Sequence, residues 1–318
     1  MNYPDEVKEF ARVRMEQTSN NTQLSRDLKN KFPSVFVDME IEQIRWTVKG
    51  WRKAWNIEAK KIPIRRIFFD IETSYYQLLI KAWQLKNYQS YFNHKDIVKE
   101  KEIICISYKW QYEDKVHTLD WTMGEKEMLK EFINIMGEAN ECVGHNGDRF
   151  DLPFIRTRCL YHGVLMFPNY RTLDTLKKAR SGFLFASNKL DYLGQFMGIG
   201  GKMEHEGMEL WDKVIEGDIN ALDRMKRYCE RDVALLEDVY FVLSPFISHE
   251  NNFAVLTGGK RWECPECASK DVKMFRTYST PMGIIRREMK CNNCKKQYKI
   301  SNKTYMSMLE SMVPKEVV

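Results

Sequence analysis

The sequence contains no long apolar run, and this absence limits what the protein can be. No stretch approaches the roughly 18 apolar residues that a membrane-spanning helix needs, so no membrane segment is expected. The first ten residues, MNYPDEVKEF, lack the basic and then apolar order of a secretory signal. Internal repeats and low-complexity tracts are also missing, which leaves no sign of a repeat architecture. A cytoplasmic globular protein is therefore the default expectation.

The charged residues are distributed unevenly along a chain that is 43% hydrophobic. Residues 1–66 contain 14 Lys and Arg against 9 Asp and Glu, residues 67–255 contain 23 against 29, and residues 256–318 contain 13 against 6. An acidic centre between two basic ends fits a metal-using catalytic body with nucleic-acid-binding modules. The alternative is that the two ends are small surface domains that happen to be basic.

Three short helices are predicted before residue 56, at about 5–16, 23–32 and 40–55. Apolar residues in the third helix follow spacings of three and four and form one stripe: Ile41, Ile44, Val48, Trp51 and Trp55. Three short helices ending in a basic one resemble a helix-turn-helix. The basic residues off the stripe thereby become candidate contacts to nucleic acid: Arg45, Lys49 and Arg52. The alternative is a small helical bundle with a solvated basic face.

Strands and helices alternate after a predicted linker at residues 56–64. Strands are predicted at residues 67–71, 103–110, 116–121, 141–145 and about 170–173. Helices are predicted at residues 125–138, 150–162, 174–180, 189–197 and 219–242. This order predicts an α/β fold in which helices cover a mixed sheet. The four single cysteines lie in apolar stretches and are expected to be buried thiols.

Asp70 and Glu72 lie at the end of a short apolar run in RRIFFDIETS, residues 65–74. The run predicts a buried strand, along which residues two apart share a face. The two carboxylates would then be side by side, where like charges repel and burial adds a further cost. A divalent cation such as Mg²⁺ would neutralise them, because it takes oxygen ligands from carboxylates. The alternative is a partly exposed pair on an edge strand.

A second acidic segment, GHNGDRFDLPFI at residues 144–155, lies where a strand is predicted to give way to a helix. Ligands often bind at strand ends in open α/β sheets. Asp148 and Asp151 are both candidates, although Asp151 could instead be a simple helix N-cap. Asn146 could be a turn former.

Tyr228 and Asp232 form a third candidate pair in the long helix predicted at residues 219–242. Being four residues apart, they lie one turn above each other beside the apolar stripe of the helix. A carboxylate there can ligate a metal while the phenol orients a water. The alternative is an ion pair between Asp232 and a neighbouring Lys or Arg on a solvated face.

FDIET, an HN-three-residue-FD segment and Y-x-x-x-D, in this order, resemble the three exonuclease motifs of the DEDD superfamily. The final Tyr marks the DEDDy branch. The chain is similar to the proofreading domains of family B DNA polymerases, and more closely to stand-alone 3′–5′ exonucleases of phages and bacteria. TLDTL, KLDYLGQFMG and GGK support the resemblance, which covers residues 65–245. It implies a ribonuclease-H-like mixed sheet flanked by helices, without an attached polymerase.

The resemblance also implies a two-metal site and the residues that form it. The ligands of two Mg²⁺ or Mn²⁺ ions, about 4 Å apart, would be Asp70, Glu72, Asp151 and Asp232. Tyr228 would orient the attacking water; a phenol titrates near pH 10, so a free base is not expected. Contacts to the substrate would come from Thr73, Asn146, Phe150 and Lys202. Asp148 does not align with a motif acid and is interpreted as a solvated neighbour.

CPEC and CNNC near the C-terminus are separated by 23 residues. Two C-x-x-C pairs at this distance predict one tetrahedral structural zinc ion, held by Cys264, Cys267, Cys291 and Cys294. Strands predicted at residues 272–278 and 284–289 make the segment a zinc ribbon. Disulfides are the alternative.

Basic and aromatic side chains accompany the cysteines: Lys290, Lys295, Lys296, Lys299, Arg286 and Arg287, with Phe275, Tyr278 and Tyr298. This composition suits contact with a nucleic-acid backbone and stacking on bases. A ribbon that docks a protein partner is the alternative.

The combined prediction is a metal-dependent 3′–5′ exonuclease that hydrolyses DNA, in preference to RNA, by a two-metal mechanism. Its domains would be a helix-turn-helix-like module at residues 1–57, the exonuclease at 64–248 and the zinc ribbon at 258–304. No membrane partner is expected, and the location would be the host cytoplasm if a phage encodes the chain. Two alternatives stay open: a ribonuclease or structure-selective endonuclease on the same fold, and a nucleic-acid-binding replication or repair accessory protein.

Overall fold

The computed structural model of the chain describes residues 3–17, 21–55, 64–81, 93–201, 207–248, 250–256 and 259–312. The chain divides into two compact units that do not follow chain order. The sheet unit comprises residues 67–172 and 202–234, and the ribbon unit comprises residues 1–66, 173–201 and 235–318. Among the described residues, no helix combines the length and the apolar character needed to cross a bilayer.

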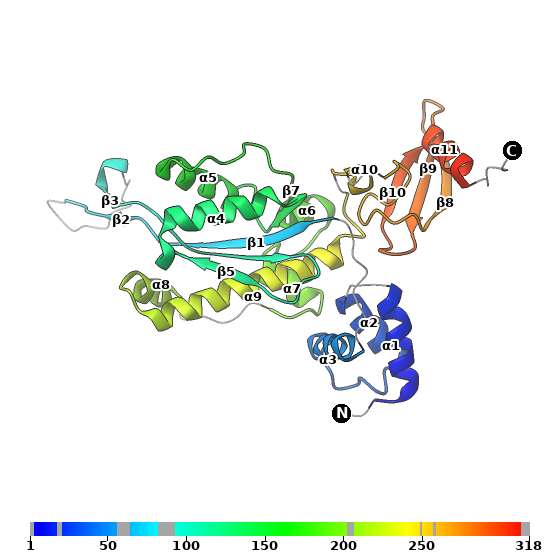
Figure 1. Ribbon diagram of the computed structural model, residues 1–318, viewed down its shortest axis with the longest axis horizontal. Helices are drawn as coiled ribbons and strands as arrows, with labels where there is room; N and C mark the ends of the chain where they lie inside the picture. The colour runs from blue at the N-terminus through cyan, green and yellow to red at the C-terminus, as the bar shows by residue number, and fades with distance from the viewer. Residues whose placement is uncertain are drawn as a thin grey trace. The chain divides into compact units, whose positions relative to one another are not determined.

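Asp70 and Glu72, the first acidic pair, lie in a mixed five-stranded sheet. Its strands are β1 (Arg66–Thr73), β4 (Ile103–Trp110), β5 (His117–Asp120), β6 (Glu141–Gly144) and β7 (Thr172–Asp174). Their order is β5-β4-β1-β6-β7, which places β1 at the centre (Figure 1). β1 pairs antiparallel with β4, and β4 pairs antiparallel with β5. The predicted α/β fold with a helix-covered mixed sheet is thus confirmed.

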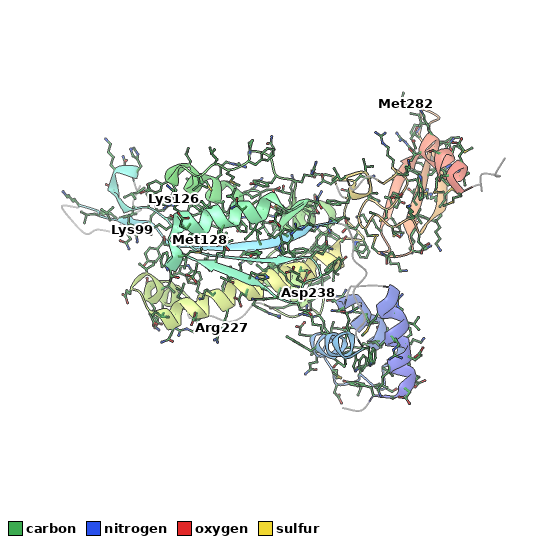
Figure 2. The ribbon with its side chains drawn as sticks, viewed as in Figure 1. Lys99, Lys126, Met128, Arg227, Asp238 and Met282 are labelled. Atoms are coloured by element: carbon green, nitrogen blue, oxygen red, sulfur yellow. The ribbon has the colours of Figure 1, made fainter. Side chains whose placement is uncertain are left out.

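Helices cover both faces of this sheet (Figure 1). The helices concerned are α4 (Glu125–Gly137) and α5 (Asp151–His162) on one face, with α8 (Met208–Ile215) and α9 (Ile219–Leu243) on the other. Exposed polar side chains occur on the outward sides of both layers, as Lys126 on α4 and Arg227 on α9 illustrate (Figure 2), and Leu160 and Tyr161 of α5 are exposed as well. Such two-sided cover explains why β1 and β4 are almost continuously apolar.

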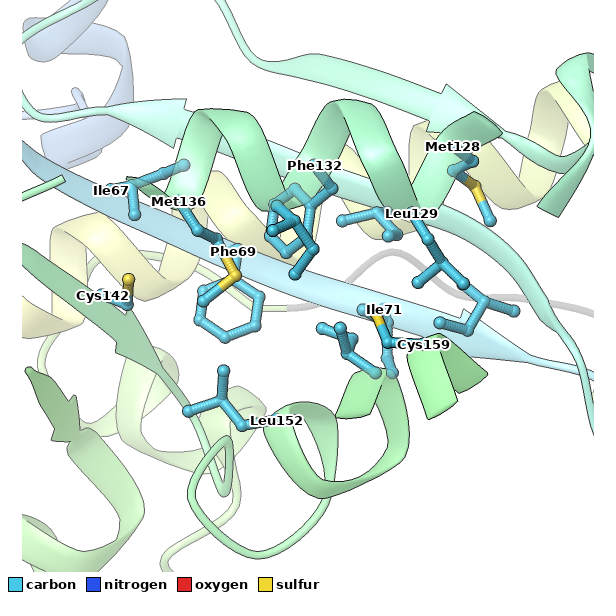
Figure 3. Packing of buried hydrophobic residues seen from close by; sticks show 14 residues of the cluster. Ile67, Phe69, Ile71, Met128, Leu129, Phe132, Met136, Cys142, Leu152 and Cys159 are labelled. Atoms are coloured by element: carbon cyan, nitrogen blue, oxygen red, sulfur yellow. The ribbon is translucent and has the colours of Figure 1, made fainter. Parts of the chain in front are cut away.

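The core on the first face is built from alternate residues of β1. Ile67, Phe69 and Ile71 point toward α4 and α5, where they pack with Phe132 and Leu152 among others (Figure 3). Cys142 and Cys159 belong to the same core, and burial raises the pKa of their thiols to about 12 and about 11. All four single cysteines are buried, as predicted.

The core on the second face joins β4 to α8 and α9. Ile104 and Cys105 of β4 pack there with Leu210 of α8 and with Met225 and Cys229 of α9. Because Asp70 and Glu72 alternate with the inward residues of the first face, their side chains belong to this second face.

The first part of the ribbon unit is a bundle of three helices, α1 (Asp5–Gln17), α2 (Asn21–Lys31) and α3 (Ile41–Ala54). Ile44 and Val48 of the predicted stripe are fully buried in its core. Two further helices of this unit are α6 (Thr175–Gly182), which Asp174 caps, and α7 (Leu190–Phe196).

The second part of the ribbon unit is a three-stranded sheet in the order β10-β9-β8. Its strands are β8 (Val272–Ser279), β9 (Ile285–Cys291) and β10 (Gln297–Ser301), flanked by α10 (Phe253–Leu256) and α11 (Asn302–Met312). The smaller elements of the chain are β2 (Gln77–Leu78) with β3 (Ile97–Lys99), and the 3₁₀ helices η1 (His94–Asp96) and η2 (Trp121–Met123).

Candidate active site

Asp70 and Glu72 lie side by side on the central strand β1. Asp70 is opposite Ser107 and Glu72 is opposite Cys105 on β4, and the register shifts between Glu72 and Thr73. Both carboxylates are partly exposed. The pair therefore belongs to a central strand and not to an edge strand, which removes the alternative drawn from sequence.

Cys229 of α9 completes a cluster with these two acids. Its Sγ lies 3.5 Å from the Asp70 carbonyl oxygen and 3.9 Å from the Asp70 carboxylate. The candidate ligand atoms of Asp70, Glu72 and Cys229 all lie within 4.8 Å of one another. Burial, together with Cys105 and the two carboxylates, raises the pKa of the Cys229 thiol well above its usual value, so the thiol is neutral. The sequence pattern predicts Cys229 as a buried thiol and does not reveal this contact; its place between Tyr228 and Asp232 was the available signal.

Asp151 joins the site through the backbone of β1. Its Oδ1 accepts a hydrogen bond of 3.3 Å from the N–H of Ile71, the residue between Asp70 and Glu72. The side chain is only 3% exposed and lies in the first turn of α5, where the helix dipole favours a negative charge. The N-cap of α5 is Phe150, so Asp151 is not the N-cap.

In the turn before α5, the backbone of Gly147 lies close to Gly144. A Cβ on Gly144 would lie 3.1 Å from Gly147 Cα, so this approach leaves little room for a side chain. Asn146 adopts φ +73°, and its carbonyl oxygen accepts hydrogen bonds from the N–H groups of Arg149 and Phe150. Asn146 is therefore a turn residue with a partly exposed side chain. The ring of Phe150 is 39% exposed and stacks on Phe154 at 6.1 Å between centroids.

Tyr228 and Asp232 are both buried on α9, at 8% and 2% exposure. The Tyr228 ring meets Trp211 of α8 edge to face at 6.4 Å. Trp211 in turn donates a hydrogen bond of 3.1 Å from Nε1 to the carbonyl oxygen of Thr73. Asp232 follows Cys229 by three residues and so lies on the same side of the helix. Among the described residues, Asp151 and Asp232 lie outside the 4.8 Å cluster of ligand atoms.

The donor set fits a hard divalent cation. Carboxylate oxygens dominate it, and such ions prefer oxygen ligands. Two of the acids are almost fully buried, and burying ionised carboxylates is costly unless positive charge compensates them. Cys229 adds a sulfur atom beside these oxygens.

The four C-terminal cysteines form a second cluster, in the ribbon unit. Their sulfur atoms lie within 4.8 Å of one another, with Cys264 and Cys294 3.5 Å apart and Cys267 and Cys291 3.6 Å apart. Tetrahedral zinc with Zn–S bonds of about 2.3 Å requires S···S distances of about 3.8 Å. Sulfur atoms in a disulfide would be only about 2.05 Å apart, so the cluster fits zinc and not disulfides.

The basic residues predicted to contact nucleic acid from α3 have structural partners. Arg45 is 7% exposed, and its guanidinium pairs with Asp238 and Glu42, which leaves it no surface to offer a nucleic acid. Arg52 donates to Asn21 and to the carbonyl oxygen of Met15. The half-buried Lys49 lies over the Trp46 ring at 5.3 Å.

Two further lysines, Lys202 and Lys296, were predicted to face the substrate or a nucleic acid. Lys202, predicted as a substrate contact, lies outside the described residues. Lys296 was predicted on the basic face of the ribbon, but it is only 3% exposed. Its ammonium donates hydrogen bonds to the carbonyl oxygens of Ser244 and Ile247, so it cannot contribute a surface charge.

Comparisons with known proteins agree with this fold. A family model described as the RNase_H superfamily matches residues 67–244. A DNA polymerase of Thermococcus aggregans is 32% identical over 88 residues, which cover 24% of this chain and 5% of that protein.

A solved structure, the family B DNA polymerase of Pyrobaculum calidifontis, aligns with a TM-score of 0.43 and 17% identity over 59% of this chain and 25% of that chain. The chain thus spans only a small part of the polymerases that it matches. Because the family model covers more than half of its 318 residues, the chain belongs to the RNase_H superfamily, a membership that supports a nuclease.

Proposed function

We propose that the protein is a metal-dependent 3′–5′ exonuclease that hydrolyses phosphodiester bonds of DNA. The observation that carries the proposal is the meeting of three acids at one strand, two on β1 and one on α5. Asp70 and Glu72 share a face of β1, and Asp151 accepts a hydrogen bond from the backbone N–H between them. The 3′–5′ direction rests on the resemblance to DEDDy exonucleases.

The metal ligands proposed are Asp70, Glu72, Asp151 and Asp232. When bound, two Mg²⁺ or Mn²⁺ ions supply an activated water and neutralise the charge that develops on the phosphate. Tyr228 precedes Asp232 by one helical turn on α9, and its hydroxyl orients the water. Thr73, Asn146 and Phe150 contact the terminal nucleotide; the carbonyl of Thr73 already accepts a bond from Trp211, which leaves its hydroxyl for that task.

The proposed domains are the helix-turn-helix-like module at residues 1–57, the exonuclease at 64–248 and the ribbon at 258–304. One structural zinc ion would be held by the four ribbon cysteines. The spacing of the four sulfur atoms supports this zinc site.

The proposal is tested by following the cleavage of 5′-labelled DNA and RNA oligomers, single- and double-stranded, over time with Mg²⁺. We expect a descending ladder on DNA. Asp70→Ala should slow cleavage by at least about 10³-fold, because several kcal/mol of charge stabilisation are lost. Asp148→Ala is the matched control, since Asp148 is a partly exposed acid in the same turn region as Asp151.

Each alternative gives a different result. A single internal cut would indicate an endonuclease, and a ladder on RNA alone would indicate a ribonuclease. A wild-type protein that binds nucleic acid but cleaves no substrate with Mg²⁺ or Mn²⁺ would overturn the proposal in favour of an accessory protein.

A further inference from the structure

A cavity of about 980 Å³ lies within the ribbon unit, between the segment that follows α9 and one face of the ribbon. We call it the ribbon groove and define it by six lining residues: Phe246, Arg261, Phe275, Lys295, Tyr298 and Lys299. A second cavity of about 500 Å³ shares Arg261 and Lys299 with it and extends it toward α11. The volume of the ribbon groove is at the upper end of the range for ligand pockets. It is far larger than a single ion needs.

Carboxylates among the described residues neutralise the cations of the ribbon groove only in part. Among the described residues, neither Arg261 nor Lys295 pairs with a carboxylate, and both are exposed. Lys299 pairs only loosely with Glu288, at 3.7 Å, and its side chain is 64% exposed. The other acid of the lining, Glu250, is already paired with Lys178 at 3.1 Å. The groove therefore presents a positive surface that fits a polyanion.

Aromatic rings lie among these cations. Phe246 is 77% exposed and Phe275 is 46% exposed, although apolar rings of this size are normally covered. Tyr298 is fixed by a hydrogen bond of 2.6 Å from its hydroxyl to the carbonyl oxygen of Trp262. Rings that alternate with cations are the pattern of single-strand sites, in which bases stack and the backbone follows the positive charges.

We propose that the ribbon groove binds single-stranded nucleic acid. The backbone phosphates lie against Arg261, Lys295 and Lys299, and unstacked bases lie on Phe246 and Phe275. A duplex is excluded as the occupant because its base faces are hidden by its own stacking. This inference rests on the proposed function, since it assigns the nuclease a second contact with its strand.

The test measures binding by the full-length chain carrying Asp70→Ala, which blocks cleavage. The probe is a 5′-fluorescein oligothymidylate of about 30 nucleotides, followed by fluorescence anisotropy over a range of salt concentrations. One variant adds Arg261→Ala and Lys295→Ala, and another adds Phe246→Ala and Phe275→Ala. The matched control adds Lys273→Ala and Lys303→Ala, which remove two exposed charges outside the groove lining.

The charge variant should bind at least about tenfold more weakly and lower the slope of log K against log salt by about 1.4, because each lost phosphate contact contributes about 0.7. The aromatic variant should bind at least about tenfold more weakly with an unchanged slope, since base stacking involves no counterion release. The control variant should keep the slope of log K against log salt of the Asp70→Ala protein to within about 0.7, which is the contribution of one phosphate contact. Zinc content and circular dichroism show that each variant is folded.

A parallel assay separates this inference from the proposed function. With Asp70 restored, the groove variants should cleave a saturating concentration of a labelled oligonucleotide with the wild-type kcat, because the acids of the sheet unit are unchanged. Groove variants that bind the long probe as tightly as the control would overturn the inference. That result would favour a polypeptide strand, added along the edge strand β10, as the occupant of the groove. Absence of cleavage by the wild type would overturn the proposed function alone.

Discussion

Tyr228 and Cys229 are neighbours in the sequence, yet they contact different parts of the site. Tyr228 packs its ring against Trp211, and Cys229 points its sulfur at Asp70. Helical periodicity predicted which residues of α9 are apolar and which lie at the margin. It could not predict the Cys229–Asp70 contact, because periodicity does not show which strand a helix crosses.

We expect Tyr228→Phe to lower kcat by about 10²-fold or more while KM and binding stay unchanged. The ring that packs against Trp211 is retained, and only the hydroxyl that orients the water is lost. Steady-state cleavage of a labelled DNA oligomer measures both constants. Tyr161→Phe, at an exposed tyrosine of α5, is the control. A rise in KM with kcat unchanged would mean that Tyr228 binds substrate instead.

At the scale of elements, Glu125 at the start of α4 bonds to both β4 and α5 within the sheet unit. Its carboxylate accepts hydrogen bonds from the N–H of Ile103 on β4 and from Arg158 on α5, and it contacts His162. Burial would raise the pKa of Glu125, but the bonds from Arg158, Ile103 and His162 outweigh it and hold that pKa below 4.5. The carboxylate thus ties the start of α4 to the strand and helix on either side.

We expect Glu125→Gln to lower the free energy of unfolding by about 1.5–3 kcal/mol at pH 7, as for hydrogen bonds to charged groups. Because the folded pKa is lowered, the contribution of the charge is complete above pH 4.5 and is lost as the pH falls through the folded value. Wild type and variant should therefore converge in acid. Urea unfolding at several pH values measures this, with Glu127→Gln at an exposed pair as control. A difference that persists below the folded pKa would show that shape, not charge, matters.

Elements were predicted well where their pattern is long. The strand at Ile103–Trp110 and the start of α4 at Glu125 agree with the prediction to the residue. The sequence analysis did not predict α8 or β10, which are short and contain too few residues for a periodicity to be visible. The shared face of Asp70 and Glu72 was predictable because strand alternation is local; the approach of Asp151 to Ile71 depends on the tertiary path of the GHNGD turn.

At the scale of the whole molecule, buried charges link segments that are far apart in the sequence. Within the ribbon unit, Arg45 of α3 pairs with Asp238 on the C-terminal part of α9. Arg66 at the start of β1 is fully buried and pairs with Glu266 of the CPEC sequence, with the rings of Tyr240 and Phe253 within 5 Å. No local pattern reveals such pairs, since each charged residue appears in the sequence as an ordinary surface residue.

We expect Glu266→Gln to lower the free energy of unfolding by about 3–5 kcal/mol, because it removes the Glu266 charge from the buried Arg66 guanidinium. The double variant Arg66→Met, Glu266→Gln should lose less than the sum of the two single variants. Urea unfolding gives all three values. Asp5→Asn, at a fully exposed carboxylate, should change nothing measurable. Additive losses would show that the two residues act independently.

The position of Glu266 between two cysteines of the ribbon cluster has a consequence for chimeric proteins. A chimera that exchanges the ribbon for one of different origin keeps Arg66 in the strand that carries Asp70 and Glu72. Unless the incoming ribbon offers a carboxylate between the cysteines of its first pair, that arginine loses the ion pair that it makes with Glu266. Nuclease and ribbon should therefore be inherited together, and a donor ribbon can be screened in advance by this one residue.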